Sequence, residues 1–125
     1  MKTILPLLII CGLLSSCDCK DFDQISISER NIPDTVLNFE DVQIMVQAEA
    51  YNGCWGDLLI ELRKNEDFTY SIKAFGTKSC CTCICPAVLV HLDTLINFKP
   101  TEKGTYFFRI WETPKNSIID TMIVE

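Results

Sequence analysis

Apolar and polar residues alternate strictly over much of the chain, most clearly from residue 42 onward. In the segment 42–50, every even position is Val, Ile or Ala, and three of the four odd positions are Gln or Glu. A period of two places these sets on opposite faces of an extended backbone, whereas helical spacing would scatter the apolar residues around the axis. The segment is therefore predicted to be a β-strand with one buried face.

The same alternation recurs in shorter segments that polar turns separate. Asn52-Gly53 is a strong turn signal, and residues 64–67 and 113–116 are polar breaks between apolar segments. Six or seven short strands without a convincing helix predict an all-β domain, and a β-sandwich is the expected architecture. The strands expected after residue 50 are 58–63, 68–75, 88–98, 105–112 and 118–125.

One segment gives a more specific signal for the fold. Glu102, Gly104 and Tyr106 are spaced two residues apart, which resembles the approach to the penultimate strand of immunoglobulin-like domains. In that family the tyrosine hydroxyl bonds back to the preceding turn, and a disulfide cysteine follows two residues later. Phe108 occupies that cysteine position, so apolar packing must replace the inter-sheet disulfide. The resemblance implies an immunoglobulin-like antiparallel β-sandwich of about seven strands over residues 36–125.

The first residues have the pattern of an export signal. Lys2 precedes an apolar run over residues 4–14, which is shorter than the ~20 residues that a membrane-spanning helix needs. The run ends in Leu14-Ser15-Ser16-Cys17, which resembles the lipobox of bacterial lipoproteins. In that family the signal peptide is removed before the cysteine, whose sulfur carries a diacylglycerol and whose new amine is acylated.

The lipobox resemblance also implies how the chain is divided. It assigns residues 1–16 to a lipoprotein signal peptide, makes Cys17 the lipidated residue, and leaves residues 17–35 as a lipid-anchored tether with at most one edge strand. The alternative is an ordinary signal peptide that is cut near Ser16, which would leave Cys17 free to pair with another cysteine.

The acidic start of the mature chain bears on its location. Asp18, directly after the lipidated cysteine, resembles an inner-membrane retention signal of enterobacteria. Acidic residues in this place also resemble the surface-export signals of Bacteroidetes lipoproteins, and the frequent Ile, Asn and Lys agree with small lipoproteins of that group. We therefore expect a lipid-anchored protein of the cell envelope, at the outer membrane in preference to the inner membrane, on its periplasmic face or at the cell surface.

Eight cysteines are the most unusual feature of the composition. Cys11 leaves with the signal peptide and Cys17 is assigned to lipid, so six thiols remain, which in an exported chain form up to three disulfides. The preferred pair is Cys54 with Cys85, because each lies in an expected inter-strand loop beside a turn former. The disulfide candidates are Cys19, Cys54, Cys80, Cys81, Cys83 and Cys85.

The run from Cys80 to Cys85 leaves two further interpretations open. In a looped conformation, the thiolates of Cys80, Cys81, Cys83 and Cys85 could bind Cu(I) or Zn(II). Cys80 and Cys83 also form a Cys-x-x-Cys motif, which drives thiol exchange at a helix start, but no such helix is expected. Structural disulfides without a metal are the preferred interpretation, and metal binding or thiol redox chemistry is the alternative.

The remaining composition argues against several classes of function. With 125 residues the chain has room for one domain, and its net charge of −6, without basic stretches, argues against nucleic-acid binding. His91 is the only histidine, and no nucleophile, phosphate-loop or zinc-protease motif accompanies it. Trp55 and Trp111 are either packing residues or aromatic contacts for a glycan or protein partner.

The sequence therefore predicts a non-enzymatic lipoprotein of the cell envelope with a structural or binding module. Its expected partners are the membrane, through the lipid on Cys17, and an envelope protein or a glycan. No cofactor is expected beyond the covalent diacylglycerol and the N-acyl chain on Cys17.

Overall fold

The computed structural model describes residues 19–79 and 84–125, which form β-strands and contain no helix. In these residues there is accordingly no helix long and apolar enough to cross a membrane. The expected signal peptide, the lipidation site Cys17 and three cysteines of the cluster, Cys80, Cys81 and Cys83, lie outside the described residues. The strands are β1 (Asp21–Asn31), β2 (Thr35–Val36), β3 (Val42–Ala50), β4 (Trp55–Glu66), β5 (Thr69–Lys78), β6 (Val90–Phe98), β7 (Gly104–Trp111) and β8 (Ser117–Val124).

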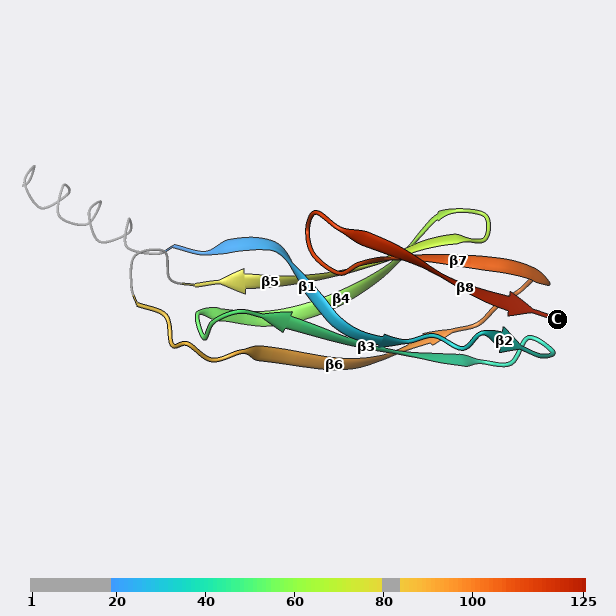
Figure 1. Ribbon diagram of the computed structural model, residues 1–125, viewed down its shortest axis with the longest axis horizontal. Helices are drawn as coiled ribbons and strands as arrows, with labels where there is room; N and C mark the ends of the chain where they lie inside the picture. The colour runs from blue at the N-terminus through green and yellow to red at the C-terminus, as the bar shows by residue number, and fades with distance from the viewer. Residues whose placement is uncertain (1–18, 80–83) are drawn as a thin grey trace, which may run out of the picture.

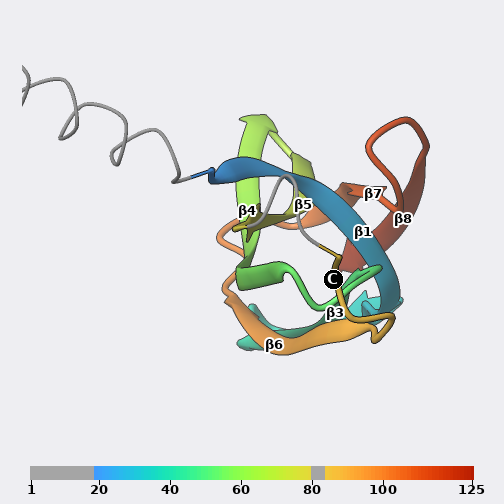
Figure 2. The ribbon, with the colours of Figure 1, turned by 90° about the vertical axis from the view of Figure 1, so that its left-hand side faces the viewer.

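The strands form one curled sheet in the order β2-β8-β7-β5-β1-β3-β6, and β4 pairs with β5 off this path (Figure 1). Residues 21–25 of β1 pair with β5, and residues 26–31 pair with β3. Seen along its length, the molecule has β4, β5, β7 and β8 on one side and β3 and β6 on the other, with β1 running from one side to the other (Figure 2). The inner faces of these two groups of strands therefore enclose one core.

The core follows from the alternation along the strands. In β3, the even positions are buried and the odd positions are exposed or half-buried, as the sequence predicts. Burial of these inward side chains is the main stabilising term, at ~1.5–3 kcal/mol for a large apolar residue. The largest buried side chains include Ile44, Ile72, Phe108, Ile110 and Met122.

The all-β prediction is confirmed, but the prediction that all strands pair antiparallel is wrong. The sheet has eight strands, and two of its pairs, β5 with β7 and β2 with β8, are parallel. Alternation along a strand specifies which face is buried and says nothing about the neighbour or its direction. The parallel pair arises because the chain between β5 and β7 passes through β6 on the opposite side of the core, a crossover long enough to return in the same direction.

The expected tether over residues 17–35 is also wrong for most of its length. Residues 21–31 form β1, which pairs with β3 and with β5 inside the sheet, and β2 begins at Thr35. Only Ile25 and Ile27 of β1 are buried, so its apolar pattern is too short to identify a strand within the sheet. The folded domain therefore begins at Asp21, well before residue 36.

The hydrogen bond expected of Tyr106 is present. Its hydroxyl donates to the Glu102 carbonyl oxygen at 2.8 Å and accepts the Glu102 backbone N–H at 3.3 Å. Gly104 has a φ of 147°, and a Cβ there would lie 3.0 Å from the Phe68 ring, so glycine is required before this corner. Phe108, at the place of the family's cysteine, is fully buried, as apolar packing requires.

Candidate functional site

A hollow of about 200 Å³ opens at the point where β1 leaves β5 and joins β3. Ile25 is the last residue of β1 that pairs with β5, and Ser26 is the first that pairs with β3. Because the two groups of strands lie on opposite sides of the core, the crossing strand leaves a gap between them. The hollow is lined by Gln24, Ile25, Ser26, Glu49, Ala50, Tyr51, Trp55 and Pro114.

The β7–β8 loop, which carries Pro114, is fixed beside β1 by direct contacts. The Ile27 N–H donates to the Glu112 carbonyl oxygen at 3.1 Å. Arg30 adds charge-assisted bonds, with its Nε 3.1 Å from Asp120 Oδ2 and its Nη1 3.4 Å from Glu112 Oε2. The wall of the hollow that Pro114 forms is therefore held in place by β1.

Two polar side chains at the hollow lack partners. Gln24 Nε2 and Trp55 Nε1 are buried donors without a hydrogen-bond acceptor. An unsatisfied buried donor costs about 1–3 kcal/mol, and because neither nitrogen is exposed to solvent, a ligand oxygen could bond to it only after the side chain turns toward the hollow. Glu49 is among the residues that line the hollow, and its Oε2 lies 3.9 Å from His91 Nδ1.

Aromatic rings form one wall of the same hollow. Tyr51 is 66% exposed, and its ring meets that of the half-buried Trp55 edge to face, with centroids 6.0 Å apart. Aromatic faces bind the C–H surfaces of sugars and of other amphipathic molecules. Donors, acceptors and an aromatic wall together fit a small polar ligand with several hydroxyl groups.

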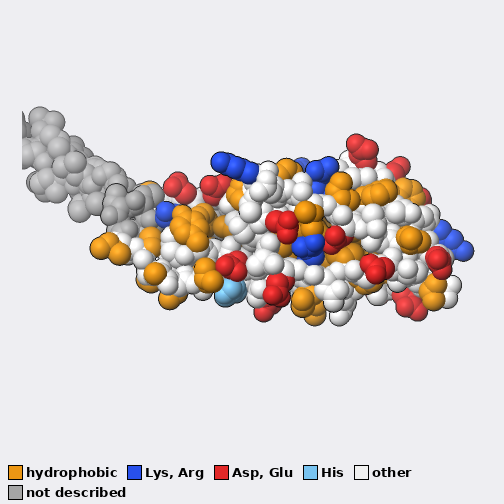
Figure 3. All heavy atoms as spheres, in the orientation of Figure 1, with side chains coloured by type: hydrophobic (Ala, Val, Ile, Leu, Met, Phe, Trp, Pro, Cys, Tyr) orange, Lys and Arg blue, Asp and Glu red, His pale blue; other side chains and the backbone are white. Residues whose placement is uncertain are grey.

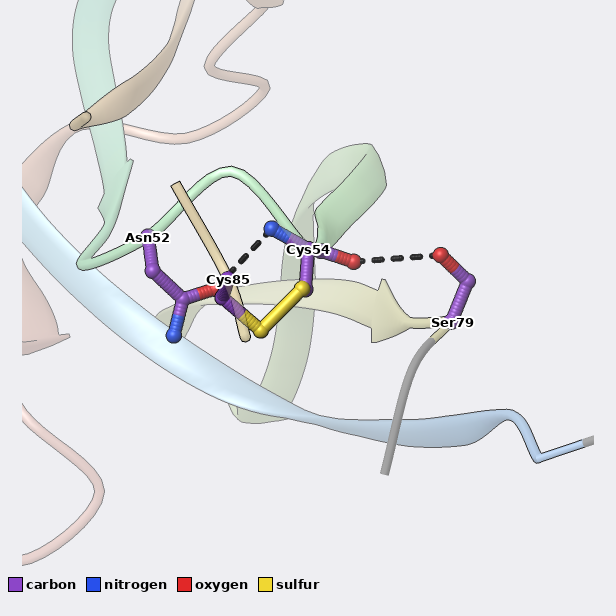
Figure 4. The surroundings of a disulfide bond; sticks show 4 residues. All are labelled: Asn52, Cys54, Ser79 and Cys85. Carbon is purple, nitrogen blue, oxygen red and sulfur yellow. Dashed lines mark hydrogen bonds between the residues drawn. A yellow bond between two sulfur atoms is a disulfide. The ribbon is translucent and has the colours of Figure 1, made fainter. Parts of the chain in front are cut away.

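The disulfide predicted between Cys54 and Cys85 is confirmed, with the two Cα atoms 5.3 Å apart (Figure 4). It joins the residue before β4 to the segment that leads into β6. Cys54 is fixed on both sides, because its N–H donates to Asn52 Oδ1 at 3.0 Å and its carbonyl oxygen accepts Ser79 Oγ at 3.2 Å. The bridge thus connects the start of β4 to the approach to β6, and closing its loop stabilises the fold by about 3–4 kcal/mol.

The other cysteine predictions are partly answered. Cys19 is disulfide-bonded, and because Cys54 and Cys85 pair with each other, its partner lies outside the described residues. The alternative four-thiolate metal set is wrong for Cys85, since its sulfur is already used in a disulfide. Within residues 19–79 and 84–125, no group of three His, Cys, Asp or Glu side chains is placed to hold a metal ion.

Of the other residues that the sequence analysis singled out, His91 and Trp111 lie outside the hollow. His91 is exposed on β6, and its ion-pair contact is with Glu49. Trp111 lies on β7 with Lys73 Nζ 5.3 Å from its ring centroid, whereas Trp55 lines the hollow. Sequence reasoning missed Gln24, which it placed in a tether, and Pro114, which it assigned to a turn, because no local pattern brings such distant segments together.

Comparison of the chain with protein-family models, with curated proteins and with solved structures finds no match. The interpretation of the hollow therefore depends on its own lining, above all on Gln24, Tyr51 and Trp55.

Proposed function

We propose that this protein is a lipoprotein of the cell envelope whose β-domain binds a ligand without chemical change, in the hollow beside Trp55. The observation that carries the binding role is the pair of buried, unpartnered donors, Gln24 Nε2 and Trp55 Nε1, at a hollow with an exposed aromatic wall. At a position that serves only packing, an apolar group of similar shape would be more stable, because it avoids the free-energy cost of burying an unpartnered donor.

The proposed ligand is a short glycan of the envelope. Each sugar hydroxyl both donates and accepts, so neighbouring hydroxyls can accept from Trp55 and Gln24 and donate to Glu49. The exposed face of Tyr51 can cover the apolar face of a sugar ring. A protein segment is the competing partner, and it would be expected to bury a larger surface than a hollow of about 200 Å³ offers.

The anchor in this proposal rests on the sequence. The apolar run of residues 4–14 and the segment Leu14-Ser15-Ser16-Cys17 support export, cleavage before Cys17 and lipidation of its sulfur. The acidic residues after the cysteine fit signals for either membrane, and the frequent Ile, Asn and Lys support placement at the outer membrane. Incorporation of labelled palmitate, and its loss in Cys17→Ala, tests this step; unchanged processing and membrane association in that variant would contradict it.

The immunoglobulin-like assignment is a further proposal. The hydrogen bond from Tyr106 to Glu102 and the buried Phe108 support it. The two parallel strand pairs depart from that family, whose two sheets are antiparallel. The relationship is therefore one of a shared corner and a β-sheet core.

The binding role is tested with the lipidated protein in detergent micelles and a panel of envelope oligosaccharides. Trp55→Phe keeps a ring and removes the N–H, so we expect about fivefold weaker binding, the equivalent of one hydrogen bond. Trp111→Phe, on the outer side of β7, is the matched control and should bind like wild type. Absence of saturable binding to any oligosaccharide, or equal losses in both variants, would contradict the proposal.

The alternative, metal binding or thiol redox chemistry at the cysteine cluster, makes a different prediction. Our proposal predicts disulfides in place of reactive thiols, as found for Cys19, Cys54 and Cys85. Intact-mass measurement with thiol counting under non-reducing conditions should give no bound metal and no reactive thiols. A co-purified metal or several reactive thiols would favour the alternative.

A further inference from the structure

The described chain begins at one end of the molecule, close in sequence to the proposed lipid site. Asp18 alone separates Cys17 from Cys19, and β1 begins at Asp21. An extended chain spans at most about 3.6 Å per residue, so the path from Cys17 to Asp21 covers at most about 14 Å. Lipid on Cys17 would therefore hold this end of the domain at the membrane surface, with no room for a longer spacer.

The same end exposes four large apolar side chains, which we call the anchor-end surface: Phe22, Ile84, Val88 and Leu89. Their exposed fractions are 62%, 97%, 55% and 55%. Phe22 is at the start of β1, Ile84 directly precedes the disulfide cysteine Cys85, and Val88 and Leu89 lie between that cysteine and β6. Hydrophobic side chains gather at the end of the molecule where β1 begins (Figure 3).

The segment that carries three of these side chains is apolar throughout. Residues 84–89 read Ile-Cys-Pro-Ala-Val-Leu, without a charged or hydrogen-bonding side chain, yet they form no strand. A backbone hydrogen bond from Gly53 N–H to the Pro86 carbonyl oxygen, at 2.9 Å, holds the segment beside the β3–β4 turn. Surface loops are usually polar, and contiguous exposed apolar groups mark contact with a protein or a membrane.

Charged and aromatic neighbours also fit a membrane interface. Lys20 and Lys78 flank the anchor-end surface, and Lys78 Nζ lies 6.0 Å from the ring centroid of Tyr51. Lysine and tyrosine are suited to the headgroup region, where one end of the side chain is apolar and the other polar. Asp21 and Asp23 alternate with Phe22 along β1, so their side chains point away from its face.

We propose that the anchor-end surface lies in the lipid interface, so that the domain rests on the bilayer instead of standing off it. The apolar side chains of Phe22, Ile84, Val88 and Leu89 would then add to the hold of the lipid on Cys17. This inference rests on the lipid anchor of the proposed function. It fixes the orientation of the domain, because the C-terminus lies at the opposite end and points away from the membrane (Figure 1).

The orientation is tested with lipidated protein in vesicles that contain brominated phospholipids, which quench nearby tryptophan. Leu89→Trp and the matched control Ile119→Trp, exposed on β8, are each made with Trp55→Phe and Trp111→Phe so that one tryptophan reports. We expect at least twofold quenching for Leu89→Trp and little for Ile119→Trp. Equal quenching at both positions, or none at either, would overturn the inference.

Mass analysis of the same samples separates the two proposals. Protein that carries lipid on Cys17 but shows no quenching at residue 89 contradicts the anchor-end surface and leaves the lipoprotein proposal standing. Protein without lipid on Cys17 contradicts both.

A second measurement isolates the apolar side chains from the lipid. Unlipidated Cys17→Ser protein should partition weakly onto vesicles, and Val88→Ser with Leu89→Ser should reduce that partition by at least about tenfold, as expected for losing two exposed apolar groups from lipid. Ile119→Ser with Ile123→Ser is the control and should partition like Cys17→Ser alone. Equal partition of the two double variants would contradict a role for the anchor-end surface and favour a protein partner for it.

Discussion

The two ends of the curled sheet are stabilised by different means. Toward the C-terminal end, large rings fill the core: Tyr70 lies 5.0 Å from Phe98 and 5.6 Å from Phe108 between ring centroids, and Phe98 lies 5.6 Å from Tyr106. Aromatic pairs of this kind add about 0.5–1.5 kcal/mol each beyond the area they bury. This end needs no covalent bridge, because packing and the Tyr106 hydrogen bond hold its strands together.

Toward the opposite end, where β1 begins, the inward positions carry small side chains. Ala48, Ala50 and Ala74 are fully buried there, and they contribute far less apolar area than the rings do. The Cys54–Cys85 bridge joins the start of β4 to the approach to β6 at this end, where packing contributes least. The comparison shows that a disulfide can supply stability where small side chains bury little apolar area. The space left beside Ala50 forms part of the hollow.

The aromatic end should respond most strongly to loss of volume. Phe108→Ala is expected to lower the free energy of unfolding by about 4 kcal/mol, because the ring is fully buried and leaves a cavity. Denaturant unfolding measures it, with the exposed Ile119→Ala expected to stay within about 0.5 kcal/mol of wild type. A loss below about 1 kcal/mol for Phe108→Ala would show that this core does not carry the stability of its end.

The end of the molecule where β1 begins should respond to loss of the bridge. Replacing both Cys54 and Cys85 with Ser is expected to cost about 3–4 kcal/mol, since the loop between them is no longer closed in the unfolded chain. Hydrogen exchange should rise most at the start of β4 and around the entry to β6, and least in β7. A uniform rise along the chain, or none, would contradict the division between the two ends.

The corner at the aromatic end makes a smaller prediction. Tyr106→Phe keeps the ring and removes the hydroxyl that bonds to Glu102, so stability should fall by about 1–2 kcal/mol. Tyr51→Phe, whose side chain is exposed, should leave the melting temperature unchanged. If the two substitutions have equal effects, the Tyr106 bond contributes nothing measurable.

The smallest expected change has the opposite sign. Gln24→Met keeps the length of the side chain and removes the amide nitrogen that is buried without an acceptor, so the ligand-free protein should gain about 1 kcal/mol. The same variant should lose affinity for the glycan, which a gain in stability alone would not cause. A clear loss of stability would mean that the Gln24 amide has a partner in solution.

Sequence predicted the strands where alternation is long and the disulfide where turn residues flank the cysteines. β3 and the Cys54–Cys85 bridge were predictable because both signals are local. β1 was not, because only Ile25 and Ile27 are buried and its remaining positions are polar or exposed, a pattern shared with a linker. Its position within the sheet depends on pairing with β3 and β5, which is information that lies elsewhere in the chain.

The parallel strand pairs and the hollow could not be predicted from the sequence, because they too depend on contacts between distant segments. Which strand lies beside β7 depends on how the chain crosses the core, and alternation does not record crossings. The hollow brings together Gln24, Tyr51 and Pro114 from three segments far apart in sequence, none of which carries a motif. The aromatic candidate Trp55 was identified from sequence, but its unpartnered N–H becomes visible only in the fold.

The most direct test of the binding role is an NMR titration of the lipidated protein with an oligosaccharide that binds in the panel above. The indole N–H resonances of the two tryptophans are followed during the titration. The Trp55 N–H has no acceptor in the free protein, so its resonance should move downfield and saturate as it gains one. The Trp111 resonance, from the outer side of β7, should stay in place. Saturation of binding with no movement at Trp55, or equal movement of both resonances, would contradict the claim that this hollow is the binding site.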